Sequence, residues 1–246
     1  MKLTFKQFLI NEARQISTHF PVHKTLNPKI WEGETLRSEV KEALLKIAQE
    51  FEEFLDTPDI EIKDIIFTGS LANFNYTRYS DIDLHLVVGA SAADNEDCKV
   101  ELDEFFMTKK NLWNQSHDID VHGFPVELYA QLEDEDVTAE GVYSINTDEW
   151  IRKPKSTQKK YDRYAVEVKA KYFINMIDKA IDDKVDDRNY LKKIMDKIKN
   201  MRKSGLEQNG EFSEENLAFK VLRNSGYLEK LSNYRSKLKD EELSLD

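Results

Sequence analysis

The sequence predicts an α/β (α+β) fold in which a small mixed β-sheet with flanking helices is followed by a C-terminal helical domain. Three observations support this prediction. Apolar residues recur at helical spacing over residues 37–55, charged and apolar residues alternate with period two over residues 81–85, and only helical periodicity is found beyond residue 155. We therefore expect a sheet-containing domain over residues 26–150 and a helical domain over residues 155–246.

The composition is that of a globular protein. A chain of 246 residues with 40% hydrophobic and 11% aromatic residues can bury a core. Because no stretch approaches the roughly 18 uninterrupted apolar residues that a membrane-crossing helix needs, we expect no membrane span and no membrane partner. The single cysteine, Cys98, excludes a disulfide framework and a cysteine-rich zinc site, and it fits a reducing compartment.

Charge is divided unevenly along the chain, whose net charge is −11. Residues 1–150 carry 13 Lys and Arg against 30 Asp and Glu, whereas residues 151–246 carry 23 against 17. An acidic part can hold metal ions and a basic part can meet phosphates. Solvated helix faces are the simpler explanation when charge is considered alone.

Two amphipathic helical patterns lie in the first 60 residues. Residues 1–13 place two phenylalanines and a leucine at i, i+3 and i+4, and lysine and glutamine interrupt the run too early for a signal peptide. Over residues 37–55, apolar residues recur at steps of three and four. We predict a long helix there with one buried face, and Pro58 marks its end.

Two strands are expected next. The short β-branched run over residues 65–67 stops at a Gly-Ser pair and predicts a buried strand. In the following strand, residues 82–88, alternation puts Asp81, Asp83 and His85 on one face of the sheet and the apolar residues between them on the other.

A hairpin is predicted after a helical pattern around residues 100–112. Its strands cover residues 119–122 and 126–132, and Gly123-Phe124-Pro125 forms the expected turn. The second of these strands can therefore extend the sheet.

Apolar periodicity and cap residues predict four helices in the C-terminal part. The first two cover residues 164–181 and 191–201, and Gly205 is expected to close the second. Ser213 is a suitable N-cap for the third helix, and Gly226 separates it from the last.

Three tyrosines, Tyr161, Tyr164 and Tyr172, are interleaved with lysines at the start of this part. Helical periodicity predicts that most of them belong to the core. The alternative is a basic stacking surface for a nucleic acid or a nucleotide base.

The most informative motif is a Gly-Ser turn followed, after ten residues, by paired aspartates. Gly69-Ser70 ends one predicted strand, and Asp81 and Asp83 begin the next. Two carboxylates in this arrangement project side by side and suit Mg²⁺, which prefers one or two carboxylates together with substrate phosphates. Glycine lets the backbone approach a ligand closely, and a serine hydroxyl with neighbouring N–H groups can hold a triphosphate.

Such a site needs a third carboxylate. Glu127 is the best candidate, because it is a single acid between apolar neighbours in a strand that can lie beside the first two acids. Asp120 is the rival, but no Gly-Ser turn precedes it at the right distance, so we expect it either on an outer strand or in a position that supports the metal ligands without binding the metal. His85 and His122 are expected to be hydrogen-bonded structural residues, since magnesium does not favour imidazole.

These residues resemble the signature of the DNA polymerase beta nucleotidyltransferase superfamily. The segments that carry the resemblance are Phe67-Thr68-Gly69-Ser70, Ser80-Asp81-Ile82-Asp83-Leu84 and Val126-Glu127-Leu128. More of the chain is similar to uncharacterised nucleotidyltransferases of large tailed phages. The resemblance implies a nucleotidyltransferase core and an enzyme that moves an NMP from an NTP, such as ATP, onto an acceptor hydroxyl and releases pyrophosphate. It also implies two magnesium ions as cofactors, with manganese as the alternative.

The resemblance also implies roles for individual residues. Asp81 and Asp83 would bind both metal ions, Glu127 would bind the ion that activates the acceptor, and Gly69 with Ser70 would contact the nucleotide phosphates. Many superfamily members have aspartate as the third acid, and glutamate reaches one carbon farther. Arg152 and Lys153 are further candidates for phosphate contacts, with ordinary surface charge as the alternative. The acceptor stays open between RNA, a protein and a small molecule.

Residues 1–13 carry a second resemblance, to the capsid-targeting peptides of internal head proteins in T-even-type phages. Those peptides are cut after a glutamate in an apolar-x-Glu motif, which here would be Ile10-Asn11-Glu12, before Ala13. A plain amphipathic helix is the alternative. The resemblance implies packaging in the phage head and action in the host cytoplasm. It also raises a second function, a non-catalytic nucleotide-binding or structural internal head protein.

Overall fold

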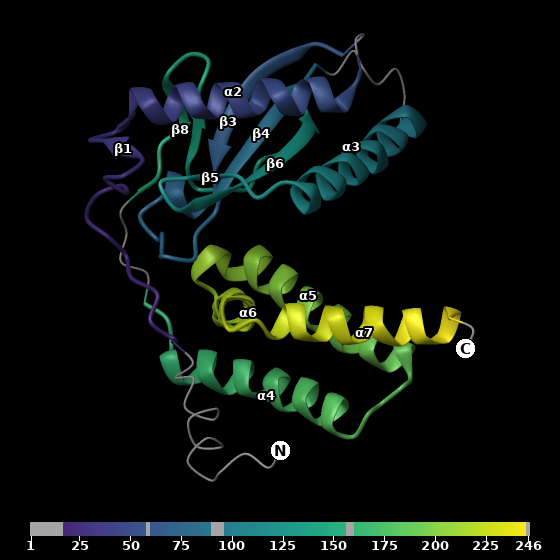
Figure 1. Cartoon of the computed structure of the whole chain (residues 1–246). Coiled ribbons are helices and arrows are strands. Elements are labelled where there is room, and N and C mark those ends of the chain that lie inside the picture. Colours follow the sequence, from purple (N-terminus) through teal and green to yellow (C-terminus); the bar gives the residue numbers. More distant parts are fainter. Residues whose placement is uncertain (1–16, 58–59, 90–95, 156–159, 245–246) are drawn as a thin grey trace. The chain divides into compact units, whose positions relative to one another are not determined.

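The computed structural model describes residues 17–57, 60–89, 96–155 and 160–244 (Figure 1). Its described residues form two compact units. Residues 21–155 form a sheet unit, and residues 17–20 with 160–244 form a helical unit. The predicted α+β class is confirmed, and none of the described helices combines the length and hydropathy needed to cross a bilayer. The segment 1–13 lies outside the described residues, so its resemblance to capsid-targeting peptides stays a prediction.

The sheet unit is built on a six-stranded mixed sheet. Its strands follow the order β5-β6-β4-β3-β7-β8. They are β3 (Ile62–Thr68), β4 (Ile82–Val88), β5 (Asp120–Val121), β6 (Phe124–Leu132), β7 (Val142–Ser144) and β8 (Glu149–Arg152). The β4–β6 pair is parallel and the other pairs are antiparallel. A separate two-stranded hairpin joins β1 (Trp31–Glu32) to β2 (Thr35–Leu36).

One face of the central strands forms the core of this unit. Along β4, Ile82, Leu84 and Leu86 are completely buried, whereas the residues between them are half-buried. Helices α2 (Ser38–Leu55) and α3 (Glu96–Ser116) contribute apolar side chains to the same core. The predicted helix and the predicted alternation are therefore confirmed, and the polar side chains of β4 point to the opposite face.

The hairpin between β5 and β6 turns one residue earlier than predicted. The turn consists of His122 and Gly123, with φ of 55° and 82°. Two consecutive positive φ values are typical of a type I′ turn, whose twist matches that of the paired strands. The turn is thus two residues long, and Phe124 and Pro125 belong to β6. The side chain of Asp120 supports this shorter turn by accepting a hydrogen bond from the Gly123 N–H at 2.9 Å.

Helix α3 runs along the outer edge of β6. Strand β5 pairs with β6 only at Phe124 and Pro125. Farther along the edge, Asn114 of α3 donates through Nδ2 to the Leu128 carbonyl and accepts through Oδ1 from the Leu128 N–H, both at 3.2 Å. These two hydrogen bonds take the place of those that the backbone of a neighbouring strand would form with Leu128, and they fix α3 against β6.

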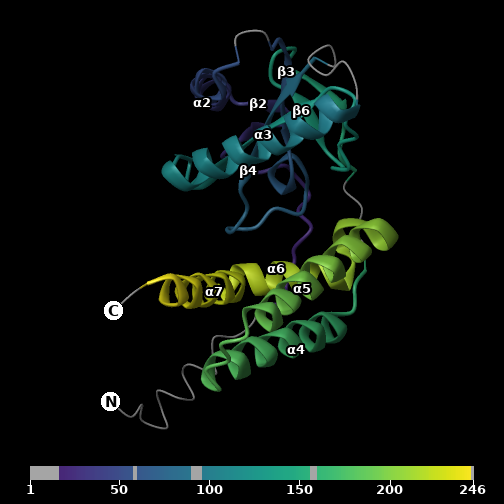
Figure 2. The same ribbon diagram turned by 90° about the vertical axis from the view of Figure 1, so that its right-hand side faces the viewer.

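The described residues of the helical unit include four α-helices, all labelled in Figure 2. They are α4 (Arg163–Asp182), α5 (Arg188–Asn209), α6 (Glu214–Asn224) and α7 (Tyr227–Leu243). Helix α6 packs against the other three. Its predicted N-cap is confirmed, since the Ser213 hydroxyl accepts from the Asn216 N–H at 3.3 Å, and Gly226 lies between α6 and α7 with φ of 78°.

Two sequence predictions for the helical unit are wrong. Helix α5 passes through Gly205 and ends at Asn209, because Gly205 is a buried packing position rather than a cap. Tyr164 and Tyr172 are 73% and 55% exposed and are not core residues. Tyr161 does join the core cluster, and its hydroxyl accepts a hydrogen bond from the Phe20 N–H at 2.9 Å.

Replacing Gly205 by alanine should destabilise the helical unit. A Cβ there would lie 2.5 Å from Glu215 Cβ and 2.7 Å from Ser213 Oγ. Gly205→Ala should lower the free energy of unfolding by about 1–3 kcal/mol because of overpacking. At an open helix position, glycine to alanine would instead raise it by about 1 kcal/mol.

Chemical denaturation followed by circular dichroism measures the effect. Asn200→Ala, on an exposed position of α5, is the control, and its change should stay within about 0.5 kcal/mol. A stability gain in Gly205→Ala would contradict the close packing of α5 on α6.

Candidate metal centre

Three carboxylates meet at one end of the β4–β6 pair. Asp81 immediately precedes β4 and Asp83 lies on it, and the parallel register places Asp83 directly opposite Glu127 of β6. Each of the three acids offers an oxygen within 4.8 Å of the other two, and all three side chains are half-buried. The sequence prediction that these acids converge is confirmed by this geometry.

Gly69 makes room for one of these carboxylates. A Cβ on Gly69 would lie 1.8 Å from Oδ2 of Asp83, and the backbone φ there is 78°. Both the contact and the dihedral exclude other residues without local rearrangement. The turn at the end of β3 therefore passes directly over the acidic cluster.

The loop that follows Gly69 is tied to the residue before Asp81. The Ser70 and Ser80 hydroxyls are 2.7 Å apart, and Ser80 Oγ also accepts from the Thr77 N–H at 2.9 Å. The short helix that begins at Ser70 is fixed from the other side, where Trp31 Nε1 donates to the Leu71 carbonyl at 2.8 Å. Ser70 thus has a structural partner, and its contact with phosphate stays a prediction.

Arg152 and Lys153 lie elsewhere in the sheet unit. Arg152 ends β8, the edge strand separated from β4 by β7 and β3. Its guanidinium donates to the carbonyls of Val137 and Ala139, the latter at 2.7 Å, and Lys153 pairs with Glu34. The structure does not bring these two cations to the acidic cluster, because strand order depends on long-range pairing that local sequence does not reveal.

The rival acid Asp120 has a structural task. It lies on β5, at the other edge of the sheet, where it supports the hairpin turn. It is not a member of the acidic cluster that contains Glu127. The preference for Glu127 agrees with this placement.

A second row of polar side chains lies beside the acids on the same face. In this row β4 places His85 next to Tyr129 of β6, and their rings stack with centroids 4.6 Å apart. His85 Nδ1 donates to Oε1 of Gln131, a side chain that is itself buried. Burial lowers the pKa of His85, and the Lys110 cation lowers it further, against the opposing effect of the Gln131 hydrogen bond.

Tyr129 is a residue of this site that the sequence reasoning did not identify. Its hydroxyl donates to Oε2 of Glu127 at 2.7 Å. Burial raises the pKa of the Tyr129 phenol, and Asp83, Glu127 and Asp81 raise it further. The period-two spacing of Glu127 and Tyr129 places both on one face and was the available signal.

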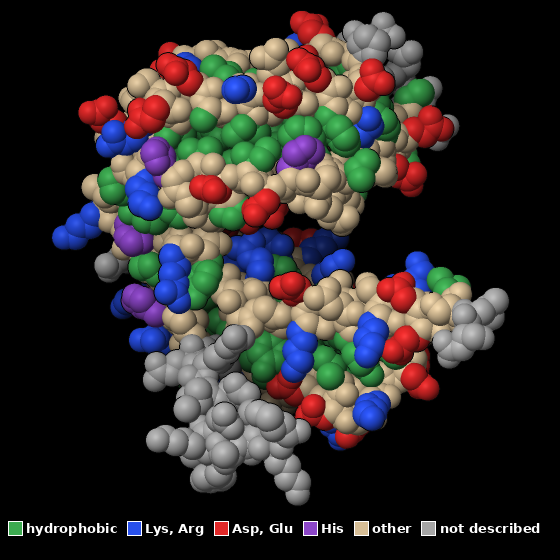
Figure 3. Space-filling view, viewed as in Figure 1, with side chains coloured by type: hydrophobic (Ala, Val, Ile, Leu, Met, Phe, Trp, Pro, Cys, Tyr) green, Lys and Arg blue, Asp and Glu red, His purple; other side chains and the backbone are tan. Residues whose placement is uncertain are grey.

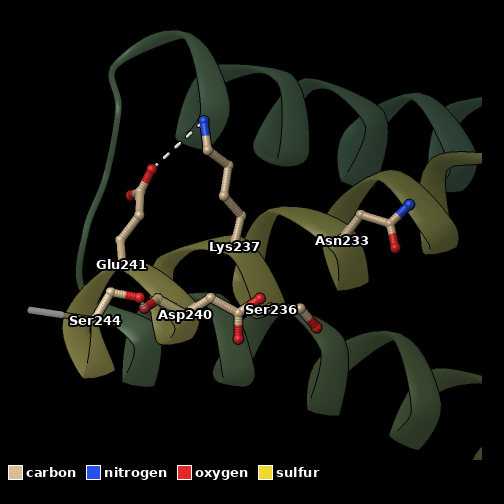
Figure 4. Close-up of a pocket in the computed structure, with 6 residues that line it drawn as sticks. All are labelled: Asn233, Ser236, Lys237, Asp240, Glu241 and Ser244. Atoms are coloured by element: carbon tan, nitrogen blue, oxygen red, sulfur yellow. Dashed lines mark hydrogen bonds and ion pairs between the residues drawn. The ribbon is translucent and has the colours of Figure 1, made fainter.

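A polar depression in the helical unit has a different character. It lies along α7 and is lined by Asn233, Ser236, Lys237, Asp240, Glu241 and Ser244 (Figure 4). Lys237 and Glu241 form an ion pair there, with Nζ and Oε1 3.5 Å apart. The lining of this depression contains two acids, whereas three carboxylates converge at β4 and β6.

The acidic cluster can hold a metal ion. Its donors are carboxylate oxygens, which suit hard divalent cations, although the donor set does not select magnesium among them. Figure 3 shows acidic side chains over the α2 side of the sheet unit and mixed charges over the helical unit.

No protein-family model matches this chain, and neither does any curated protein or solved structure. Its function is therefore inferred from the residues of the acidic cluster.

Adding a side chain at Gly69 should damage the acidic cluster. Gly69→Ala would push the Asp83 carboxylate aside, so Mn²⁺ affinity should fall by about tenfold or more. The fraction of free Mn²⁺, measured by electron paramagnetic resonance, reports the affinity.

Gly33→Ala is the matched control. Gly33 also has a positive φ, 66°, but a Cβ there would meet nothing within 4 Å. Its Mn²⁺ affinity should equal that of the wild type. Equal losses in the two variants would show that backbone strain, and not contact with Asp83, causes the effect.

Proposed function

We propose that this protein is a magnesium-dependent nucleotidyltransferase that moves an NMP from an NTP onto an acceptor hydroxyl. One observation carries the proposal: Asp81 and Asp83 come from one stretch of chain and Glu127 from another, and the three converge beneath the glycine turn at residue 69. A half-buried carboxylate cluster under a close backbone turn suits a metal-bound triphosphate.

The charge of the cluster makes transfer dependent on a cation. Three carboxylates and a triphosphate repel each other at short range, and this repulsion is strong in a half-buried site. Magnesium, when bound, would neutralise the phosphates and favour loss of the acceptor proton. We expect two ions, and manganese should replace magnesium because it accepts the same oxygen ligands.

The chemical step is an in-line displacement at the α-phosphorus. The acceptor oxygen forms a bond to this phosphorus, the hydroxyl proton passes to solvent water, and the bond to the bridging oxygen breaks so that pyrophosphate leaves with the electron pair. Asp83 lies against the turn at Gly69, and with Asp81 it would hold the triphosphate side of the site. Glu127, on the neighbouring strand, would hold the acceptor side.

Removing one carboxylate should abolish turnover without unfolding the protein. Asp81→Asn and Asp83→Asn keep the side-chain shape but remove the negative charge that would bind the cation. Mg²⁺-dependent release of pyrophosphate should therefore fall at least about 100-fold. The assay supplies all four NTPs with RNA, protein and small-molecule acceptors, and thermal unfolding monitors the fold.

Asp120→Asn is the matched control, since it changes an acid of the same sheet unit outside the cluster. It should retain wild-type turnover. Full activity in Asp81→Asn or Asp83→Asn would refute the proposal that these acids form the catalytic site. Calorimetric binding of Mg²⁺ and NTP without turnover by the wild type would favour a non-catalytic nucleotide-binding protein.

A further inference from the structure

Glu127 is hydrogen-bonded to a side chain from its own strand. Tyr129 lies two residues farther along β6 and its hydroxyl donates to Oε2 of Glu127 at 2.7 Å. A phenol is a donor to a carboxylate at neutral pH, and such a charge-assisted bond is short and directional. One oxygen of Glu127 therefore has a fixed partner next to the other two acids.

The ring of Tyr129 is itself held by two neighbours. The His85 ring stacks on it with an interplanar angle of 24°. Lys110 Nζ lies 3.6 Å from the ring centroid, a cation–π contact that comes from α3. Because Asn114 fixes α3 against β6, the position of the phenol depends on two strands and one helix.

The hydrogen bond from Tyr129 restricts a side chain that is longer than that of aspartate. A glutamate side chain has one more rotatable bond than aspartate, so ordering it costs more conformational entropy. A hydrogen bond to Oε2 restricts the carboxylate before any ligand arrives, and the same carboxylate offers an oxygen to the acidic cluster. Less entropy is then lost when a cation binds.

We propose that Tyr129 is a positioning residue that holds Glu127 in the orientation needed for metal binding. This inference rests on the proposed metal site and adds a residue to it. Tyr129 acts through Glu127 by a hydrogen bond and does not contact the ion.

Metal affinity tests the inference without any turnover. The full chain is titrated with Mn²⁺ alone, and the free ion is counted by electron paramagnetic resonance. Tyr129→Phe removes the hydroxyl and keeps the ring that contacts His85 and Lys110. The dissociation constant for Mn²⁺ should rise about tenfold, as is usual when a residue that orients a metal ligand is lost.

Tyr143→Phe is the matched control. Tyr143 lies on β7 of the same sheet, and its hydroxyl donates to Oδ1 of Asp148 at 2.6 Å. The variant thus loses the same kind of bond at a carboxylate outside the cluster. Its Mn²⁺ affinity should match that of the wild type.

A double variant separates positioning from a general structural effect. Glu127→Gln weakens Mn²⁺ binding by removing the charged ligand, so adding Tyr129→Phe to it should cause little further loss. Unchanged affinity in Tyr129→Phe, or an additive loss in the double variant, would overturn the inference alone. A wild-type chain that binds no Mn²⁺ would overturn the proposed function as well.

Discussion

The parallel pairing of β4 with β6 is the constraint on which the site depends. Its register puts Asp83 opposite Glu127 and Leu84 opposite Leu128, so that acids share one face and leucines the other. Because side chains alternate strictly along a strand, a slip by one residue would bury Glu127 and expose Leu128. Burial of the leucine face against α2 and α3 therefore also fixes the position of the third acid.

The polar face is organised in successive rows across the sheet. Thr68, Asp83 and Glu127 form one row, and Ile66, His85 and Tyr129 form the next. The acidic row is held from one side by the turn at Gly69 and from the other by the phenol of Tyr129. Rigid elements thus hold these carboxylates close together against their mutual repulsion, which is the kind of preorganisation that a metal site needs.

Local patterns predicted much of the fold and of the site. Alternation over residues 82–88 predicted the strand and the shared face of Asp81 and Asp83, and apolar neighbours singled out Glu127. Features that depend on distant contacts were missed. Gly205 has the sequence context of a cap but is required by packing against Glu215, and the turn at His122 depends on a positive φ, which is uncommon for residues other than glycine. Strand order, which separates Arg152 from the acids, is likewise set by long-range pairing.

A crystal structure with Mn²⁺ and a non-hydrolysable NTP analogue tests the central claim most directly, since anomalous scattering locates the ions without assumption. We predict manganese bound to oxygens of Asp81, Asp83 and Glu127, with the triphosphate beside Gly69. Manganese bound only at other positions, or Glu127 turned away from the two aspartates, would contradict the proposed site.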